Sequence, residues 1–464
     1  MVDALAPSRP RERRAAGLAG GFGDALATRR GLRVALVAAL ATLTGCSLFE
    51  DDERLEGERI RVRDRVATIA TETVNTVPGQ ALPAPRRLDD WTQTGAVATH
   101  NGGHLAGPVT LSEAWQADIG DGSSSDGAIT SAPVVAEGRI FALDAAAQVT
   151  ALSATSGDEV WSTDLTPEGE DSENGFGGGL AWSDGRVFAS TGFGEALALN
   201  ADTGEILWRV SLGAPIRAAP AVDGDLLIAV ARNNIAFGLS TADGAIQWRS
   251  QGLNSEAGVL GGASPAITRT GAILPFGSGE IVAVDRLTGQ RFWGSVLSGG
   301  ARGLARGQIS DVTGDPVIIG GLVVAANQAG RLAAVQSSTG RRAWTRSIGA
   351  VGPIWGADSS LFLVTDTAQL VRLDTATGST VWGAQLPRFE DEEDREDPIT
   401  YSGPVLVQGG VLVTSSLGEL LRFDAETGVP VDVVELGDGS ITGPVVAGDF
   451  LYVLTDDGDI EAYR

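Results

Sequence analysis

The chain has 464 residues, 43% of them hydrophobic, and a formal net charge of −25 at pH 7. This length and composition allow a large buried core. The acidity, together with the absence of lysine, argues against nucleic acid as a partner and against charge-driven adhesion to an anionic bilayer. The single cysteine, Cys46, excludes a disulfide framework.

The first 45 residues are predicted to be a secretory signal peptide. An arginine-rich segment precedes the apolar run 34–43, which is too short to cross a bilayer as a mature helix. The run ends in Leu43-Thr-Gly-Cys46, which resembles the bacterial lipobox. That resemblance implies cleavage before Cys46 and a lipid on its thiol, and Ser47 favours sorting to the outer membrane.

Two alternatives accompany this interpretation of the N-terminus. Cys46 could instead follow an ordinary signal peptide by chance, or be a buried core thiol. Thr28-Arg-Arg-Gly-Leu-Arg33 loosely resembles a twin-arginine signal, although general secretion is the favoured route. Residues 46–90 are polar, highly charged and then proline-containing, so we expect a lipidated cysteine followed by a flexible tether. A multiply acylated cysteine would hold such a chain durably at the membrane.

A turn with a tryptophan four residues after its glycine recurs through residues 91–464. Six copies have this spacing: Gly157 and Trp161, Gly204 and Trp208, Gly244 and Trp248, Gly289 and Trp293, Gly340 and Trp344, and Gly378 and Trp382. In a seventh copy, Gly428 keeps the turn but Asp432 replaces the tryptophan. The region is therefore built of repeats.

The sequence between these turns predicts an all-β fold. Short runs rich in Val, Leu, Ile and aromatic residues, separated by Gly and Asp, are typical of antiparallel strands in hairpins. A four-stranded unit every 40 to 50 residues indicates a β-propeller blade, and eight units can be counted. The last unit ends at Arg464 without its fourth strand. We expect residues 113–119 to supply it and to close an eight-bladed ring with no open sheet edge.

The same region offers no catalytic constellation. The two histidines, His100 and His104, precede the first blade, and we expect them to pack this segment against one face of the ring rather than to bind a metal. Without Cys, Lys or a further His, Cys/His metal sites and histidine-activated nucleophiles are excluded from the blades. The acidic inserts 168–173 and 389–398 could bind calcium, but runs of like charge are more often solvated loops. We therefore expect no catalytic residue, metal or cofactor.

The repeat Leu-Asp-x-x-Thr-Gly-x-x-x-Trp resembles that of the PQQ-like propellers, from about Trp91 to Arg464. Within that superfamily the quinoprotein alcohol dehydrogenases bind PQQ and calcium and carry an adjacent cysteine pair, which this chain lacks. The chain instead resembles the BamB family in its lipobox, its short tether and its eight-bladed propeller without further domains. Members of that family are non-catalytic lipoproteins of the outer-membrane β-barrel assembly machine. A PQQ-dependent dehydrogenase and a sensor or adhesion propeller remain the alternatives.

The BamB resemblance implies a periplasm-facing scaffold that docks on a POTRA domain of the barrel subunit BamA. In that family, the loops between blades three and four and between blades four and five make the contact. The candidate contact residues here are Leu253, Val259, Leu260, Leu304 and Asp311. Thr313 stands where the family has a second acid, and the family's arginine in the first loop is missing. Leu253 and Leu304 could alternatively fold back over the sheet edges. Unfolded outer-membrane proteins are a further possible partner, through strand addition at sheet edges.

Overall fold

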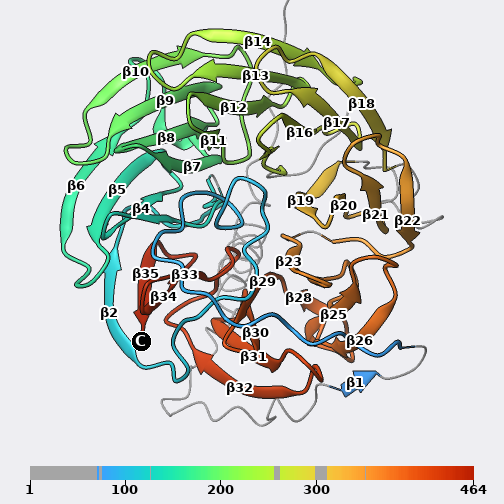
Figure 1. Cartoon of the computed structure of the whole chain (residues 1–464). Helices are drawn as coiled ribbons and strands as arrows, with labels where there is room; N and C mark the ends of the chain where they lie inside the picture. The colour runs from blue at the N-terminus through green and yellow to red at the C-terminus, as the bar shows by residue number, and fades with distance from the viewer. Residues whose placement is uncertain (1–69, 73–75, 126, 255–261, 298–310, 351) are drawn as a thin grey trace, which may run out of the picture. The chain divides into compact units, whose positions relative to one another are not determined.

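The computed structural model describes residues 70–72, 76–125, 127–254, 262–297, 311–350 and 352–464. These residues belong to the compact unit Arg63–Arg464, and the predicted signal peptide and Cys46 lie outside them. Eight four-stranded antiparallel sheets are arranged as the blades of a propeller (Figure 1). This confirms the predicted fold.

Each of the first four blades is a meander of four consecutive strands, numbered from the centre outwards. Blade 1 contains β3 (Val134–Ala136), β4 (Arg139–Leu143), β5 (Gln148–Ser153) and β6 (Glu159–Asp164). Blade 2 contains β7 (Gly178–Ser183), β8 (Arg186–Thr191), β9 (Glu195–Asn200) and β10 (Ile206–Ser211). Blade 3 contains β11 (Ala221–Asp223), β12 (Leu226–Ala231), β13 (Ile235–Ser240) and β14 (Ile246–Gln251). Blade 4 contains β15 (Ala266–Ile267), β16 (Gly271–Pro275), β17 (Glu280–Asp285) and β18 (Arg291–Val296).

The remaining blades follow the same plan. Blade 5 contains β19 (Val312–Ile319), β20 (Leu322–Asn327), β21 (Arg331–Gln336) and β22 (Arg342–Arg346). Blade 6 contains β23 (Trp355–Ala357), β24 (Ser360–Val364), β25 (Gln369–Asp374) and β26 (Thr380–Gln385). Blade 7 contains β29 (Tyr401–Val407), β30 (Gly410–Ser415), β31 (Glu419–Asp424) and β32 (Pro430–Glu435). Blade 8 contains β33 (Val445–Ala447), β34 (Phe450–Leu454), β35 (Asp459–Tyr463) and β2 (Glu113–Asp118).

The ring closes in blade 8, as the sequence predicted. Strand β2 pairs antiparallel with β35, with Trp115 opposite Ala462 and Asp118 opposite Asp459. Backbone hydrogen bonds between Ser112 and Arg464 extend this pairing to the end of the chain. A strand from before blade 1 therefore completes the last blade and covers the outer edge of β35, which would otherwise be unpaired.

The repeated tryptophans join each blade to the next. Six of them donate an indole N–H to a backbone carbonyl in the turn between the third and fourth strands of the following blade, at 2.8–3.1 Å. The indole of each tryptophan also packs against the glycine of that turn; a Cβ on Gly289, for example, would lie 2.7 Å from the Trp248 indole. All six turn glycines contacted in this way have positive φ angles. The spacing of glycine and tryptophan is thus the repeat of an inter-blade joint.

The exception in blade 7 has a structural explanation. Blade 8 has no covalent turn between its third strand β35 and its fourth strand β2, because β2 comes from before blade 1. A tryptophan in β32 would have no such turn to pack against. Asp432 occupies the position instead and pairs with Arg422, which also donates to the Val109 carbonyl just before β2.

Residues 88–105, hereafter the central segment, cross the middle of the ring (Figure 1). Residues of this segment form hydrogen bonds with the innermost strand, or the turn that follows it, in every blade. The residues that bond to blades 1 to 5 are, in order, Trp91, Thr92, Gln93, Ala98 and Thr99, and those that bond to blades 6 to 8 are Gly103, Leu105 and Leu88. These bonds fall at or near the ends of the first strands, so the central segment covers one face of the ring.

Chain before the central segment also contacts the blades. Strand β1 (Ala70–Glu72) pairs with β26 as a fifth strand of blade 6, and the Val77 N–H donates to the Thr380 carbonyl. The expectation of a free tether as far as residue 90 is therefore wrong at its C-terminal end. In the described part of the chain, no helix has the length and hydrophobicity needed to cross a membrane.

Candidate functional site

Leu253 lies at the start of the connection between blades 3 and 4, directly after β14, and its side chain is 54% exposed. Its backbone is held on both sides. The Asn234 side-chain amide donates to the Leu253 carbonyl at 2.7 Å, and the Leu253 N–H donates to the Glu280 carboxylate at 3.2 Å. Glu280 also pairs with Arg291. An apolar side chain is thus presented to solvent from a fixed base, as a contact residue requires.

Asp311 lies at the end of the connection between blades 4 and 5, directly before β19, and it packs beside the β16–β17 turn of blade 4. The turn between β16 and β17 contains Gly277, whose Cβ, if present, would lie 3.2 Å from an Asp311 oxygen and 3.3 Å from the Asn234 side-chain oxygen. The structure thus brings the described ends of the two candidate loops to one turn. Asp311 itself is only 7% exposed, so its carboxylate is not on the surface. Direct contact of this carboxylate with a partner is therefore disfavoured.

The other predicted contact residues, Val259, Leu260 and Leu304, lie outside the described residues, as does the predicted lipidation site Cys46. Sequence reasoning overlooked Asn234 and Glu280, which hold the base of the first loop. A signal for the acid was present: Glu280 follows a turn glycine, as Glu195 and Glu419 do in their blades.

The two histidines pack the central segment, in agreement with the interpretation from sequence. The His104 Nδ1–H donates to the Pro83 carbonyl at 2.6 Å, and its Nε2 accepts the Gly409 N–H at 2.8 Å. His100 is 2% exposed, and its Nδ1–H donates to the Pro316 carbonyl at 3.1 Å. Burial lowers the pKa of His100 to about 4. His100 is therefore a neutral packing group at pH 7, and His104 packs with both ring nitrogens hydrogen-bonded to the backbone.

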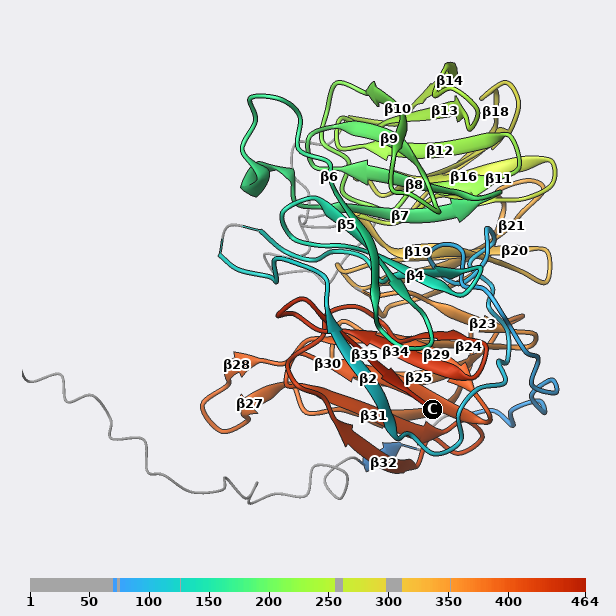
Figure 2. The ribbon, with the colours of Figure 1, turned by 90° about the vertical axis from the view of Figure 1, so that its left-hand side faces the viewer.

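The acidic inserts are local surface structures. The second forms a hairpin of β27 (Phe389–Asp391) and β28 (Glu396–Pro398), whose carboxylates are exposed. The first leads into the short 3₁₀ helix η1 (Ser172–Gly175). Figure 2 shows both on the side of the ring opposite the central segment. Among the described residues no group of three or more His, Cys, Asp and Glu side chains is placed to hold a metal ion.

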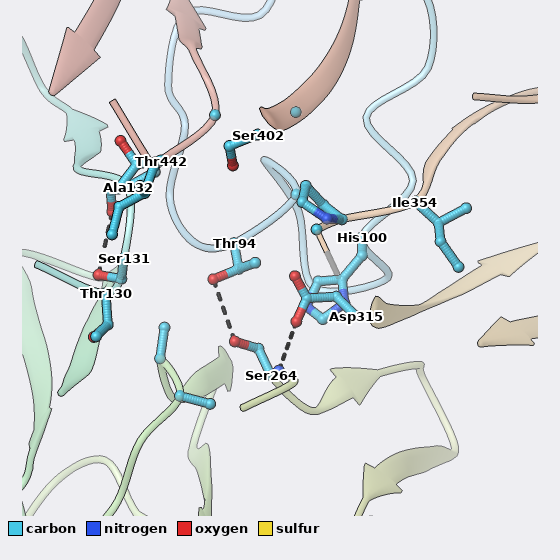
Figure 3. A pocket seen from close by; sticks show the side chains of 18 of the residues that line it. Thr94, His100, Thr130, Ser131, Ala132, Ser264, Asp315, Ile354, Ser402 and Thr442 are labelled. Carbon is cyan, nitrogen blue, oxygen red and sulfur yellow. Dashed lines mark hydrogen bonds between the residues drawn. The ribbon is translucent and has the colours of Figure 1, made fainter. Parts of the chain in front are cut away.

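A cavity of about 440 Å³ occupies the middle of the ring (Figure 3). Its lining combines the central segment, through Trp91, Thr94 and His100, with the starts of the first strands. Thr94 and Ser264 hydroxyls are 3.3 Å apart, and the Ser264 N–H donates to Asp315 at 2.7 Å. Desolvation raises the pKa of Asp315 to about 7. Asp315 is the only Asp, Glu, Lys or Arg in the described lining.

Comparison with known sequences decides the family. The profile of the family described as outer membrane protein assembly factor BamB matches residues 91–172 and 145–384, more than half of the chain. The chain belongs to the BamB family. The BamB of Yersinia pestis is 25% identical over 442 residues, covering 94% of this chain and 99% of the relative. The BamB of Moranella endobia is 27% identical over 341 residues, covering 71% of this chain and 84% of the relative.

Solved structures support the BamB-family fold. The crystal structure of BamB from Moraxella catarrhalis superposes with a TM-score of 0.63 at 20% identity, covering 76% of this chain and 100% of that one. Quinohemoprotein alcohol dehydrogenase from Comamonas testosteroni also has a TM-score of 0.63, at 14% identity, covering 82% of this chain and 81% of that one. Because these identities are low, the structural matches establish the shared propeller and not a shared activity.

Proposed function

We propose that this BamB-family chain is a non-catalytic scaffold lipoprotein of the outer-membrane β-barrel assembly complex. Its family membership carries the assignment, since the matched relatives are named outer membrane protein assembly factors. In this proposal, Cys46 carries the lipid anchor and the propeller faces the periplasm. The scaffold binds a POTRA domain of BamA and so assists the insertion of outer-membrane proteins.

The loop base at Leu253 supports a docking surface at blades 3 to 5. An exposed leucine on a backbone fixed by Asn234 and Glu280 loses little conformational freedom on binding, which favours affinity. Val259, Leu260 and Leu304 belong to the same two loops and complete the proposed apolar contact. Asp311 contributes by holding the loop end beside Gly277, rather than by touching the partner.

A pull-down from detergent-solubilised envelopes tests this proposal. We expect the wild-type chain to recover the barrel-assembly subunit, and Leu253→Asp to weaken recovery about 30-fold, the effect of losing about 2 kcal/mol at a contact hot spot. Leu287→Asp is the matched control, because Leu287 is 73% exposed in the β17–β18 turn of blade 4. Equal loss in both variants would refute the site, and failure of the wild type to recover the subunit would refute the function.

The dehydrogenase alternative fits the cavity poorly. PQQ carries three carboxylates, whereas the described lining has no Arg or Lys and contributes one carboxylate, Asp315. Placing like charges together in a partly desolvated cavity is unfavourable. Titration with PQQ should therefore give no saturable binding; tight binding would reinstate the enzyme hypothesis.

Strand addition is a second candidate role, favoured by β1. This segment pairs antiparallel with β26, with Ala70 opposite Gln385, and so shows that the outer edge of a blade accepts an added strand. Unfolded outer-membrane proteins could use such edges in the same way. Removing residues 70–72 from the chain should increase binding of a barrel-strand peptide; unchanged binding would contradict this role.

A further inference from the structure

The central cavity is built by a repeated feature of the blades. Seven blades open with a residue followed by proline, and the residues before the proline all line the cavity. Six of them are small: Ala132, Ala219, Ser264, Gly352, Gly403 and Gly443. Small side chains at these positions leave the middle of the ring hollow. In blade 5, the seventh position is Asp315.

Asp315 is therefore the one charged residue at a position otherwise kept small. One carboxylate oxygen accepts the Ser264 N–H at 2.7 Å, which is the only hydrogen bond of this carboxylate within the described part of the chain. That bond needs an acceptor oxygen but no charge, so an asparagine would serve. The other oxygen has open capacity beside the cavity, and burying such a group without a partner is costly.

We propose that the central cavity binds a small organic cation, with a primary ammonium or guanidinium group on an apolar body, and that Asp315 is its counter-ion. The cavity volume of about 440 Å³ is in the range of ordinary ligand sites. An ammonium group would donate to the open oxygen of Asp315 and to hydroxyls that line the same cavity, among them those of Thr94 and Ser264. Trp91 and Trp355, stacked at 5.6 Å between ring centroids, line the cavity and would receive the apolar body.

The charge of the molecule favours the same ligand class. The net charge of −25 raises the local concentration of cations around the chain and lowers that of anions. His100 is the only other titratable side chain that lines the cavity among the described residues of the central segment, β15, β19 and β23. Because the pKa of His100 is lowered to about 4, this ring adds no positive charge near neutral pH.

The test is calorimetric titration of the purified full chain with 2-phenylethylammonium, with 2-phenylethanol as the uncharged match. Asp315→Asn keeps the oxygen that accepts the Ser264 N–H and removes the charge. Asp225→Asn is the control, because Asp225 is exposed in the β11–β12 turn and does not line the cavity. Circular dichroism and the melting temperature show whether each variant is folded.

We expect the ammonium ligand to bind the wild type saturably and to bind Asp225→Asn with unchanged affinity. Compared with the ammonium ligand on the wild type, the alcohol on the wild type and either ligand on Asp315→Asn should bind at least tenfold more weakly. With a carboxyl pKa of about 7, about 3% of Asp315 is ionised at pH 5.5 and about 97% at pH 8.5, so affinity should rise about 30-fold. Absence of saturable binding, equal affinity for the alcohol, or equal affinity in folded Asp315→Asn would overturn the proposal. If that variant does not fold, pH-independent affinity of the wild type would overturn it.

Discussion

The inter-blade joint can be tested by adding a single methyl group. Gly289 lies in the β17–β18 turn with a φ of +68°, and a Cβ at this position would meet two atoms of the Trp248 ring at 2.7 Å. Trp248 belongs to β14 of the preceding blade, is 6% exposed, and donates its indole N–H to the Arg286 carbonyl at 2.9 Å. The substitution Gly289→Ala therefore perturbs the turn conformation and the contact between blades 3 and 4 together.

A matched glycine separates the two contributions. Gly185 has a φ of +73° in a hairpin turn of blade 2, and no heavy atom would lie within 4 Å of its added Cβ. Holding alanine in the left-handed region costs about 1–2 kcal/mol at either position. Overlap with the Trp248 ring should add about 1–3 kcal/mol in Gly289→Ala alone, the usual cost of inserting a methyl group into a packed interface.

The assay is urea unfolding followed by both fluorescence and circular dichroism, with coincident transitions required before free energies are compared. We expect Gly289→Ala to lose about 2–5 kcal/mol and Gly185→Ala about 1–2 kcal/mol. In a Trp248→Ala background the additional loss at Gly289 should disappear, because the overlapping ring is gone. Equal losses at the two glycines, or an additional loss that persists without the ring, would refute the joint.

Three further predictions concern the central segment and the cavity. Gly102→Ala should cost about 1–3 kcal/mol of unfolding free energy, because its Cβ would lie 2.2 Å from Trp355, and amide exchange of Gly103 and Leu105 should accelerate; unaltered exchange would contradict this packing. Acidification should destabilise the fold through His100: its pKa of about 4 lies below the unfolded value near 6.5, so about 3 kcal/mol is fully present above pH 6.5 and is lost between pH 6.5 and 4. Asp315, with a pKa of about 7, has the opposite effect: its contribution to stability is present below pH 3.8 and is lost as pH rises to 7, so it partly offsets the loss from His100 on acidification. Asp315→Asn should therefore lose stability more steeply than the wild type in urea titrations at pH 6.5, 5.5 and 4.5. Parallel stability profiles of the two proteins would exclude this offset.

The fold could be predicted because its periodic contacts are written into the sequence. A tryptophan must follow the turn glycine by four residues to sit in the fourth strand and reach the next blade, so the spacing recurs in blades 1 to 6. In blade 8, Trp115 of β2 packs on Gly157 of blade 1 without a turn glycine before it. The replacement by Asp432 was visible in the sequence but could not be explained there. Its cause, the missing turn in blade 8, depends on which strand closes the ring.

The central segment and the cavity could not be predicted from the sequence in the same way. The bonds of residues 88–105 are mostly made by backbone groups, and each blade is met at an irregular interval, so no residue pattern records them. The burial of Asp311 beside Gly277 likewise depends on a contact between two loops and a turn. Asp315 did leave a signal, since it is the only charged residue before a first-strand proline. That signal gains a meaning only once those positions are known to meet around a cavity.

Strand direction places both proposed sites on one face of the ring. First strands start, and fourth strands end, on the same face in every antiparallel blade, so Leu253 after β14 lies on the face where the first strands start. Asp315 lies in the first half of such a strand, β19. The central segment covers the opposite face, as Figure 2 shows. A protein docked at Leu253 would therefore approach the ring from the side on which the cavity is not covered by that segment. Binding of the ammonium ligand before and after addition of the proposed POTRA partner would measure whether one occupant excludes the other, since any coupling between two sites must be equal in both directions.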